Sequence, residues 1–241
     1  MIIDMFTYYN EKELLDFHIN HVYDLVDKIV VIEGDRTFDG RAYRSDVKLN
    51  DPKIEHHILP LLENPRDRWE NEALQRRQAG EIAKQNDGTL FYECADEIIH
   101  PAFYMNFTEP HCLSLDNFYY YFNGKDVGEK PDHPMPIALP TSMITDLHQQ
   151  WESRHNFITI PNAGWHFSYL GGIDRIKQKL EAYSHIEFDT PTVKDNLAKN
   201  IKEGKDIFGR PDHRFEFVPI DDTFPEELVN NQEKYKELIY A

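Results

Sequence analysis

The chain has 241 residues, of which 40% are hydrophobic and 13% aromatic, enough to build the core of one large α/β domain or two small ones. With 43 acidic and 26 basic residues it carries a formal net charge of -17, which disfavours nucleic acid and membrane surfaces as partners. An anionic substrate would therefore need a local basic cluster or a bound cation. Only Cys94 and Cys112 are present, too few for a disulfide framework.

The N-terminal segment lacks the basic and apolar stretches of a signal peptide, and no apolar run approaches the length of a membrane span. We therefore expect a cytoplasmic protein that does not insert into a membrane. The sequence shows no internal repeat and no linker, so a single domain over residues 1–241 is predicted.

The first hundred residues alternate between β-forming apolar runs and two helical segments, one with apolar residues at helical spacing and one strongly polar segment bounded by Asn64-Pro65 and Asn86-Asp87-Gly88. Strands are predicted at residues 2–8, 28–33, 54–61 and 90–94. Helices are predicted at residues 11–26, capped by Asn10, and at 66–85. This order predicts an α/β fold with a mostly parallel central sheet and helices on both faces.

The second half of the chain is less regular. Strands are predicted at residues 117–123, 157–161 and 165–170. Helices are predicted at residues 173–183, from Thr190 onward and at 225–240. The segment 124–140, rich in proline, glycine and charge, is predicted to be a loop. The aromatic run 119–122 suits either a core strand or a surface on which acceptor sugar rings stack.

An acidic corner, Asp96 and Glu97, follows the fourth predicted strand. Ligands of parallel sheets bind beyond the carboxyl ends of the strands, an edge that Asn10 and Glu33 also occupy. Paired carboxylates at this edge can hold Mg²⁺ or Mn²⁺, which neutralises the charge on a leaving diphosphate. The alternative is that both acids cap the turn and face solvent. Glu93 points the other way along the strand.

Glu72, Gln75 and Arg76 share one face of the helix predicted at 66–85, because they are spaced i, i+3, i+4. An arginine held by a glutamate one turn earlier can bind a phosphate or a uracil-like ring. The alternative is a surface salt bridge on a solvated helix. The main basic cluster of the chain surrounds this group, at Arg66, Arg68 and Arg77.

Small residues precede Trp165 and His166, and Gly171-Gly172 follows, a pattern that suggests close approach of the backbone to a ligand. His166 is a candidate metal ligand or diphosphate donor. The alternative is a core histidine whose hydrogen bonds are satisfied internally. The sequence contains no H-E-x-x-H zinc motif, no G-x-S-x-G elbow and no P-loop, so those enzyme classes lack support.

Five segments in this order resemble glycosyltransferase family 17, whose best-known member adds the bisecting N-acetylglucosamine to N-glycans. They are DMFTYYNEKELLDFHI, VVIEGDRTFDGR, WENEALQRRQ, ECADEI and GWHFSYLGGIDRIKQKLEAYSHIEF. The resemblance covers nearly the whole chain. It implies a GT-A fold, a nucleotide-sugar donor, inversion at the anomeric carbon and use of a divalent metal.

The resemblance also implies roles for individual residues. Asp96 and Glu97 match the end of the family's D-A-D-E segment. The matches that imply donor binding are Glu72, Gln75 and Arg76 of an E-x-x-Q-R helix, Trp165 and His166 of a G-W-H segment, and Lys179 for the lysine that follows. Cys94 departs from the family, which usually has an aspartate there. The implied metal ligands are therefore Asp96 with Glu93 or His166 in support.

Together these observations predict a glycosyltransferase of a bacterial or viral type. Residues 1–100 are expected to bind a UDP-linked donor, and residues 101–241 the acceptor. The expected sugar is N-acetylglucosamine and the acceptor a glycan, a lipid-linked sugar or a glycoprotein, although the bisecting reaction itself is not carried over. An inverting enzyme needs a general base near the acceptor hydroxyl. The candidates are Asp116, Asp146 and Glu187.

Two alternatives to a transferase stay open. One is a metal-dependent phosphoesterase or hydrolase of nucleotide sugars that uses the same acids. The other is a non-catalytic protein that binds a glycan or a nucleotide, in which Cys94 marks lost metal binding.

Overall fold

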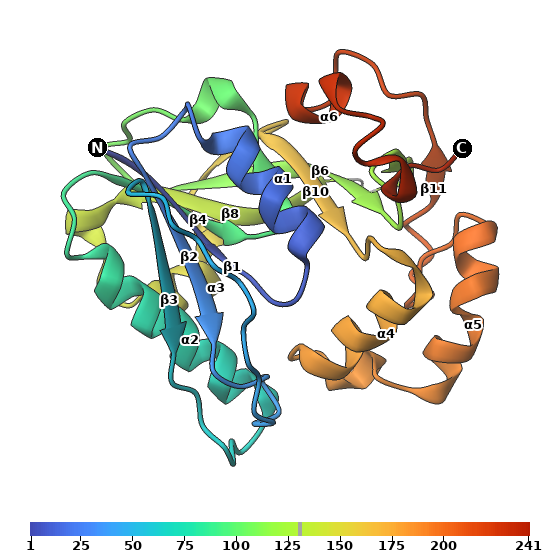
Figure 1. The fold of residues 1–241 in the computed structure, drawn as a ribbon, viewed down its shortest axis with the longest axis horizontal. Coiled ribbons are helices and arrows are strands. Elements are labelled where there is room, and N and C mark those ends of the chain that lie inside the picture. The colour runs from blue at the N-terminus through green and yellow to red at the C-terminus, as the bar shows by residue number, and fades with distance from the viewer. Residues whose placement is uncertain (130–131) are drawn as a thin grey trace.

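The computed structural model describes residues 1–129 and 132–241, and within them a sheet of eleven strands is the central element (Figure 1). The strands are β1 (Ile2–Thr7), β2 (Lys28–Gly34), β3 (Ile54–Leu59), β4 (Thr89–Cys94), β5 (Glu97–Ile99), β6 (His111–Tyr119), β7 (Gly124–Asp126), β8 (Asp132–Pro140), β9 (Ile158–Ile160), β10 (Gly164–Ser168) and β11 (Phe215–Phe217). The helices are α1 (Lys12–Val22), α2 (Arg68–Ala83), α3 (Leu147–Glu152), α4 (Gly172–Ala182), α5 (Pro191–Lys202) and α6 (Glu226–Asn230).

The main path of the sheet has the order β11-β7-β6-β8-β4-β1-β2-β3, while β9 and β10 pair with β6, and β5 pairs with β10. β5, β7 and β8 run against the other strands. The sheet is therefore mixed but mostly parallel, and the predicted α/β fold is confirmed. Within the described residues, no helix has the length and apolar character needed to cross a membrane.

Helices cover both faces of the parallel strands β1, β2 and β4 (Figure 1). On one face α2 and α3 pack against the sheet, and the buried side chains there include Met5, Val30, Ala79, Tyr92, Leu147 and Trp151. On the other face lies α1, and the buried side chains there include Phe6, Leu15, Val22 and Val31. Because both faces are covered, β2 carries a continuous apolar run rather than an alternating one.

α2 begins where its polar sequence allows a cap. The Asp67 carboxylate accepts a hydrogen bond from the backbone N–H of Glu70 at 3.0 Å. Small residues on its inner side let α3 approach closely, since a Cβ at Gly80 would lie 2.9 Å from the Cβ of Leu147. This close packing fixes α3, and with it Trp151, beside the cavity described below.

The predicted helix cap at Asn10 is wrong. α1 begins at Lys12, and Asn10 has a φ of 51°, which places it outside the helix. Its side-chain amide donates instead to Oε1 of Gln178, in α4, at 3.3 Å. Asn10 therefore connects the loop after β1 to α4.

The prediction of a loop over 124–140 is also wrong, because its described part contains β7 and β8. β8 lies between β4 and β6, and its residues Ile137, Ala138 and Leu139 are fully buried. The prolines of this segment suggest a loop because proline cannot donate a hydrogen bond in a sheet. The three apolar residues between Pro136 and Pro140 nevertheless carry the pairing with β4.

The strand predicted at 117–123 lies earlier in the chain, as β6. It ends at Tyr119, since Tyr120 has a φ of 73° that turns the chain out of the sheet. Tyr120 and Phe122 are buried in the core, whereas Tyr119 lines the cavity. The aromatic run is therefore mainly a core element.

The C-terminal helix predicted at 225–240 is broken. α6 is only five residues long, and a 3-10 turn follows at Lys236–Leu238. The chain turns between them so that Leu228, Tyr235 and Leu238 bury together in one cluster. The helices predicted at 173–183 and after Thr190 are confirmed as α4 and α5.

Candidate active site

A cavity of about 530 Å³ opens at the carboxyl ends of β1, β2 and β4. The loops that follow these strands form one wall, which includes Tyr9 and Asp96. α2 and the segment after α3 form a second wall, with Arg76 and Arg154, and the chain from β10 through α4 closes the cavity with Lys179. Ligands of such sheets bind at this edge, so the cavity is the candidate active site.

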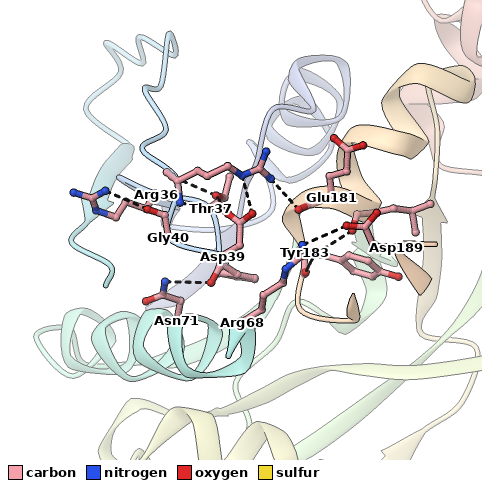
Figure 2. A network of polar contacts seen from close by, with 12 residues as sticks. Arg36, Thr37, Asp39, Gly40, Arg68, Asn71, Glu181, Tyr183 and Asp189 are labelled. Atoms are coloured by element: carbon pink, nitrogen blue, oxygen red, sulfur yellow. Dashed lines mark hydrogen bonds and ion pairs between the residues drawn. The ribbon is translucent and has the colours of Figure 1, made fainter. Parts of the chain in front are cut away.

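A polar network beside the cavity fixes α4 against the first half of the chain (Figure 2). Arg41, in the loop after β2, donates to the carbonyl oxygen of Glu181 at 2.9 Å. Arg68 of α2 donates to the carbonyl oxygen of Tyr183 at 3.1 Å and pairs with Asp189 at 3.3 Å. These contacts join elements that are more than a hundred residues apart in sequence, and they hold the helix that carries Lys179.

Asp96 lies on the turn between β4 and β5, faces the cavity and is only 5% exposed. Its Oδ2 accepts hydrogen bonds from Lys179 Nζ at 2.6 Å and from Ser168 Oγ at 3.1 Å. His166 Nε2 lies 3.6 Å from the same oxygen. Burial raises the pKa of Asp96, but the charges of Lys179 and then His166 outweigh it and hold the pKa well below its usual range. Asp96 is thus a buried, ionised carboxylate.

Glu97 is buried as well, but it stabilises the turn. Its Oε2 accepts a hydrogen bond from the backbone N–H of Cys94 at 2.6 Å, and burial raises the pKa of its carboxyl group. The alternative in which both acids face solvent is therefore wrong. Capping of the turn is observed for Glu97, although inside the protein rather than at its surface.

His166, on β10, reaches the cavity from the core. Its Nδ1 lies 2.9 Å from the side-chain oxygen of Asn117 on the neighbouring strand β6. That contact fixes the ring so that Nε2 points toward Asp96. The ring is almost fully buried, as the core interpretation predicts, and it also lines the cavity, so its role as a metal ligand or diphosphate donor stays a prediction.

Of the expected metal ligands, Asp96 and His166 lie side by side, with Nε2 3.6 Å from Oδ2, but Glu93 does not join them. Strand alternation places Glu93 on the opposite side of β4 from Cys94, and its Oε1 lies 3.4 Å from Nε2 of His18. The carboxylate of Asp96 already accepts a hydrogen bond from the ammonium group of Lys179. The residues at this corner therefore do not fit a three-ligand Mn²⁺ or Mg²⁺ site.

Glu93 instead belongs to a fully buried group with Asp4 and His18, whose ligand atoms lie close enough together to hold a metal ion. His18 Nε2 lies 3.3 Å from Asp4 Oδ1, and Tyr104 donates its hydroxyl proton to Asp4 Oδ2 at 2.8 Å. Burial alone would lower the pKa of His18, but the two carboxylates raise it to about 10. A protonated His18 thus satisfies the same geometry without a metal.

Two arginines stack on one tryptophan at the wall formed by α2 and α3. The guanidinium carbons of Arg76 and Arg154 lie 3.5 and 3.7 Å from the ring centroid of Trp151. Arg76 is 6% exposed and forms an ion pair with Glu72, which contradicts a solvated surface pair. Its Nη1 makes no hydrogen bond within the described residues, and Glu152 Oε1 lies 3.8 Å away. Gln75, buried on the same face, also lines the cavity.

Several of the predicted residues are not among those that line the cavity: Asn10, Glu33, Glu93, Trp165 and Glu187. Glu33 is fully buried and pairs with His56 Nε2 at 2.6 Å. Trp165 turns into the core, where its indole N–H donates to the carbonyl oxygen of Thr223 at 3.1 Å. Glu187 is 54% exposed and pairs with His185 at 2.7 Å.

Neither of the other candidate bases lines the cavity. Asp116 pairs with Lys125 at 3.0 Å. Asp146 accepts a hydrogen bond from the backbone N–H of Gln149 at the start of α3 and pairs with Arg77 at 3.1 Å. Both carboxylates therefore serve local ion pairs or caps.

Sequence reasoning missed several residues that line the cavity, among them Glu152, Arg154, Arg210, Phe38 and Trp69. The only local signal was the spacing of Trp151 and Arg154, which lets both side chains lie on the same side of a helical turn. The remaining residues come from separate loops, so no spacing in the sequence links them.

The small residues before Trp165 serve the fold rather than a ligand. Gly164 has a φ of 152°, and a Cβ there would lie 2.0 Å from the carbonyl oxygen of Ile98. The close approach predicted from this pattern is therefore that of β10 to β5. Nothing lies within 4 Å of a Cβ built at Gly172.

The fold and the cavity define an α/β protein with its candidate site at the carboxyl edge of parallel strands, an arrangement that fits a GT-A-like fold. The model of glycosyltransferase family 17 matches residues 1–239, and the chain belongs to that family. Membership supports a glycosyltransferase, for which a nucleotide-sugar donor and a glycan acceptor are implied. No match was found among curated proteins.

Proposed function

We propose that this protein transfers a sugar from a UDP-linked donor to a hydroxyl group of a glycan, a lipid-linked sugar or a glycoprotein, with inversion. The observation that carries donor binding is a group of cations in a chain of net charge -17. Arg76, Arg154, Lys179 and Arg210 all line the cavity. Such side chains bind a diphosphate through charge-assisted hydrogen bonds. N-acetylglucosamine is proposed as the sugar on the family resemblance alone.

The aromatic part of the cavity wall suits the base of the nucleotide. Tyr9, Phe38 and Trp69 line the cavity, and aromatic rings stack on nucleobases whatever their sequence. Trp69 is 41% exposed and so has a free surface to offer. We place the base against this wall and the diphosphate nearer Lys179 and Arg76.

Donor binding in this proposal draws on both halves of the chain. Residues 1–100 supply Asp96, Arg76 and the aromatic wall, but Arg154 and Lys179 belong to residues 101–241. On this proposal the donor site is formed by both halves of the chain rather than by residues 1–100 alone. The acceptor is proposed to enter from the side of the cavity formed by the segment after α3.

Inversion requires a base that takes the proton of the acceptor hydroxyl as its oxygen attacks the sugar. Glu187 is held on an exposed turn outside the cavity. Among the carboxylates that line the cavity, the Glu152 side chain is 53% exposed, compared with 12% for Glu72 and 21% for Glu11. The ion pair of Glu152 within the described residues is a long one, with Arg76 Nη1 3.8 Å from its Oε1. We propose Glu152 as the base.

Nucleotide binding tests the function directly. UDP, GDP and CMP are added in turn, and the melting temperature is followed, because a ligand that binds the native state stabilises it. We expect UDP to raise the melting temperature. The Arg76→Gln variant should bind UDP roughly 10- to 100-fold more weakly, as expected for the loss of a hydrogen bond from a charged group.

The neighbouring Arg77→Gln variant is the matched control, since Arg77 is 48% exposed and pairs with Asp146 outside the cavity. If none of the three nucleotides stabilises the wild-type protein, the proposed donor site is wrong. Release of free sugar from UDP-N-acetylglucosamine without an acceptor would favour a hydrolase. Binding without any turnover across an acceptor panel would favour a non-catalytic protein.

A further inference from the structure

The carboxylate that the family resemblance assigns to a divalent cation is held by a lysine. Asp96 Oδ2 accepts from Lys179 Nζ at 2.6 Å and from Ser168 Oγ at 3.1 Å. A Mg²⁺ ion sits only about 2.0–2.1 Å from its oxygen ligands and requires close to six of them. An ion bound to Oδ2 would have to occupy the space that the ammonium group fills.

Of the other expected ligands, His166 lies at this corner, with Nε2 3.6 Å from Asp96 Oδ2, but among the described residues no third histidine, cysteine or acid completes a group of ligands there. Glu93 points to the opposite face of the sheet, where it joins His18. Cys94, at the position of the expected first aspartate, accepts a hydrogen bond from Thr7 Oγ1 at 3.4 Å. A sulfur ligand suits softer metals than Mg²⁺ or Mn²⁺. Two more carboxylates line the cavity near Asp96, but both are already bonded within the protein. Glu11 Oε1 accepts from Lys179 Nζ at 3.1 Å, and Glu97 Oε2 accepts from the backbone N–H of Cys94 at 2.6 Å.

Lys179 is built into the cavity wall as a fixed cation. Its side chain is 22% exposed, and its ammonium group is held by Asp96 and by Glu11 Oε1 at 3.1 Å. It also lies 5.4 Å from the ring centroid of Tyr169. The helix that carries Lys179, α4, is held in place by the hydrogen bonds that Arg41 and Arg68 donate to backbone carbonyl oxygens at its C-terminal end (Figure 2).

We propose that the ammonium group of Lys179 takes the place of the divalent cation, so that this protein binds its donor without a metal. The inference rests on the proposed function. As the acceptor oxygen bonds to C1 of the sugar, its proton passes to the base. The bond between C1 and the phosphate oxygen breaks, and its electron pair stays on that oxygen. A preorganised ammonium facing this oxygen stabilises the charge that develops there, and Asp96 and Glu11 position the ammonium.

Titration calorimetry with UDP tests this on the wild-type protein, once in excess EDTA and once in excess Mn²⁺. We expect the same affinity in both buffers. Binding in Mn²⁺ but not in EDTA would overturn the inference and leave the proposed donor site intact. Absence of UDP binding in both buffers would overturn the donor site and this inference together.

Variants of Lys179 then test the residue itself, in EDTA. Lys179→Met keeps the length of the side chain without its charge and should weaken UDP binding roughly 10- to 100-fold, whereas Lys179→Arg should lose less. Lys177→Met, on the same helix but outside the cavity, should match the wild type. An unchanged affinity of Lys179→Met for UDP would overturn the role of the ammonium. The buffer comparison on the wild type decides the case if Lys179→Met does not fold.

Discussion

Replacing His18 by glutamine removes the positive charge from the buried group of Asp4, His18 and Glu93. All three side chains are 0% exposed, and the imidazole Nε2 lies 3.3 and 3.4 Å from the two carboxylates. Loss of one partner from a buried ion pair costs about 3–5 kcal/mol, because the remaining charge stays buried without compensation. For a chain of this size each kcal/mol shifts the melting temperature by about 2–4 °C, so a drop of roughly 6–20 °C is expected.

The matched control is the same substitution at His57, whose pair with Glu55 at 3.4 Å is 35% and 43% exposed. A surface pair of this kind contributes about 0–1 kcal/mol. Urea unfolding, followed by circular dichroism, gives the free energy of unfolding of both variants. Equal losses in the two variants would refute the assignment of a buried charged histidine.

The pH dependence of the difference in unfolding free energy between the wild type and His18→Gln is a second test. The pKa of His18 is raised from 6.5 to about 10 in the folded protein. Its contribution to stability is therefore fully present below pH 6.5 and is lost as the pH rises toward 10. The stability gap between the wild type and His18→Gln should narrow over that range, and a constant gap would contradict the protonated state. A loss of wild-type stability on adding EDTA would instead place a metal ion in this group.

Three further predictions concern the site and its frame. Glu152→Gln should lower kcat by about 10²–10⁴ while UDP affinity is unchanged, and Glu81→Gln, 70% exposed on α2, is its control; normal turnover of Glu152→Gln would exclude Glu152 as the base. Cys94→Asp adds a carboxylate at the corner, so Mn²⁺ should tighten UDP binding in this variant but not in the wild type, as calorimetry can show. Gly164→Ala should lower the free energy of unfolding by about 1–3 kcal/mol, because its Cβ would lie 2.0 Å from the carbonyl oxygen of Ile98; urea unfolding at wild-type stability would contradict this.

Apolar periodicity in the first hundred residues was sufficient to predict β1, β2, β4 and α1, because these elements bury continuous or periodic apolar faces. The prediction failed for β8, whose prolines suggest a loop, and for the C-terminal segment, which was predicted as one polar helix but packs its apolar residues through turns. In both cases long-range packing outweighs local preference. At Asn10, too, a long-range contact outweighs the local preference, since its side-chain amide donates to Gln178 in α4 and does not cap α1.

Five short sequence segments were enough to place the chain in glycosyltransferase family 17. Asp96, Arg76 and Lys179 became candidate site residues because they lie within those segments. Which of the candidates meet was decided only by the tertiary structure. Glu93 and Asp96 are three residues apart, yet the pleat of β4 and the turn after it send them to different sites. Asp96 and Lys179 are 83 residues apart and in direct contact. The physical reason is that a strand fixes the direction of each of its side chains locally. The partner at the sheet edge comes from a segment distant in sequence, and only the packing of that segment against the sheet brings it there.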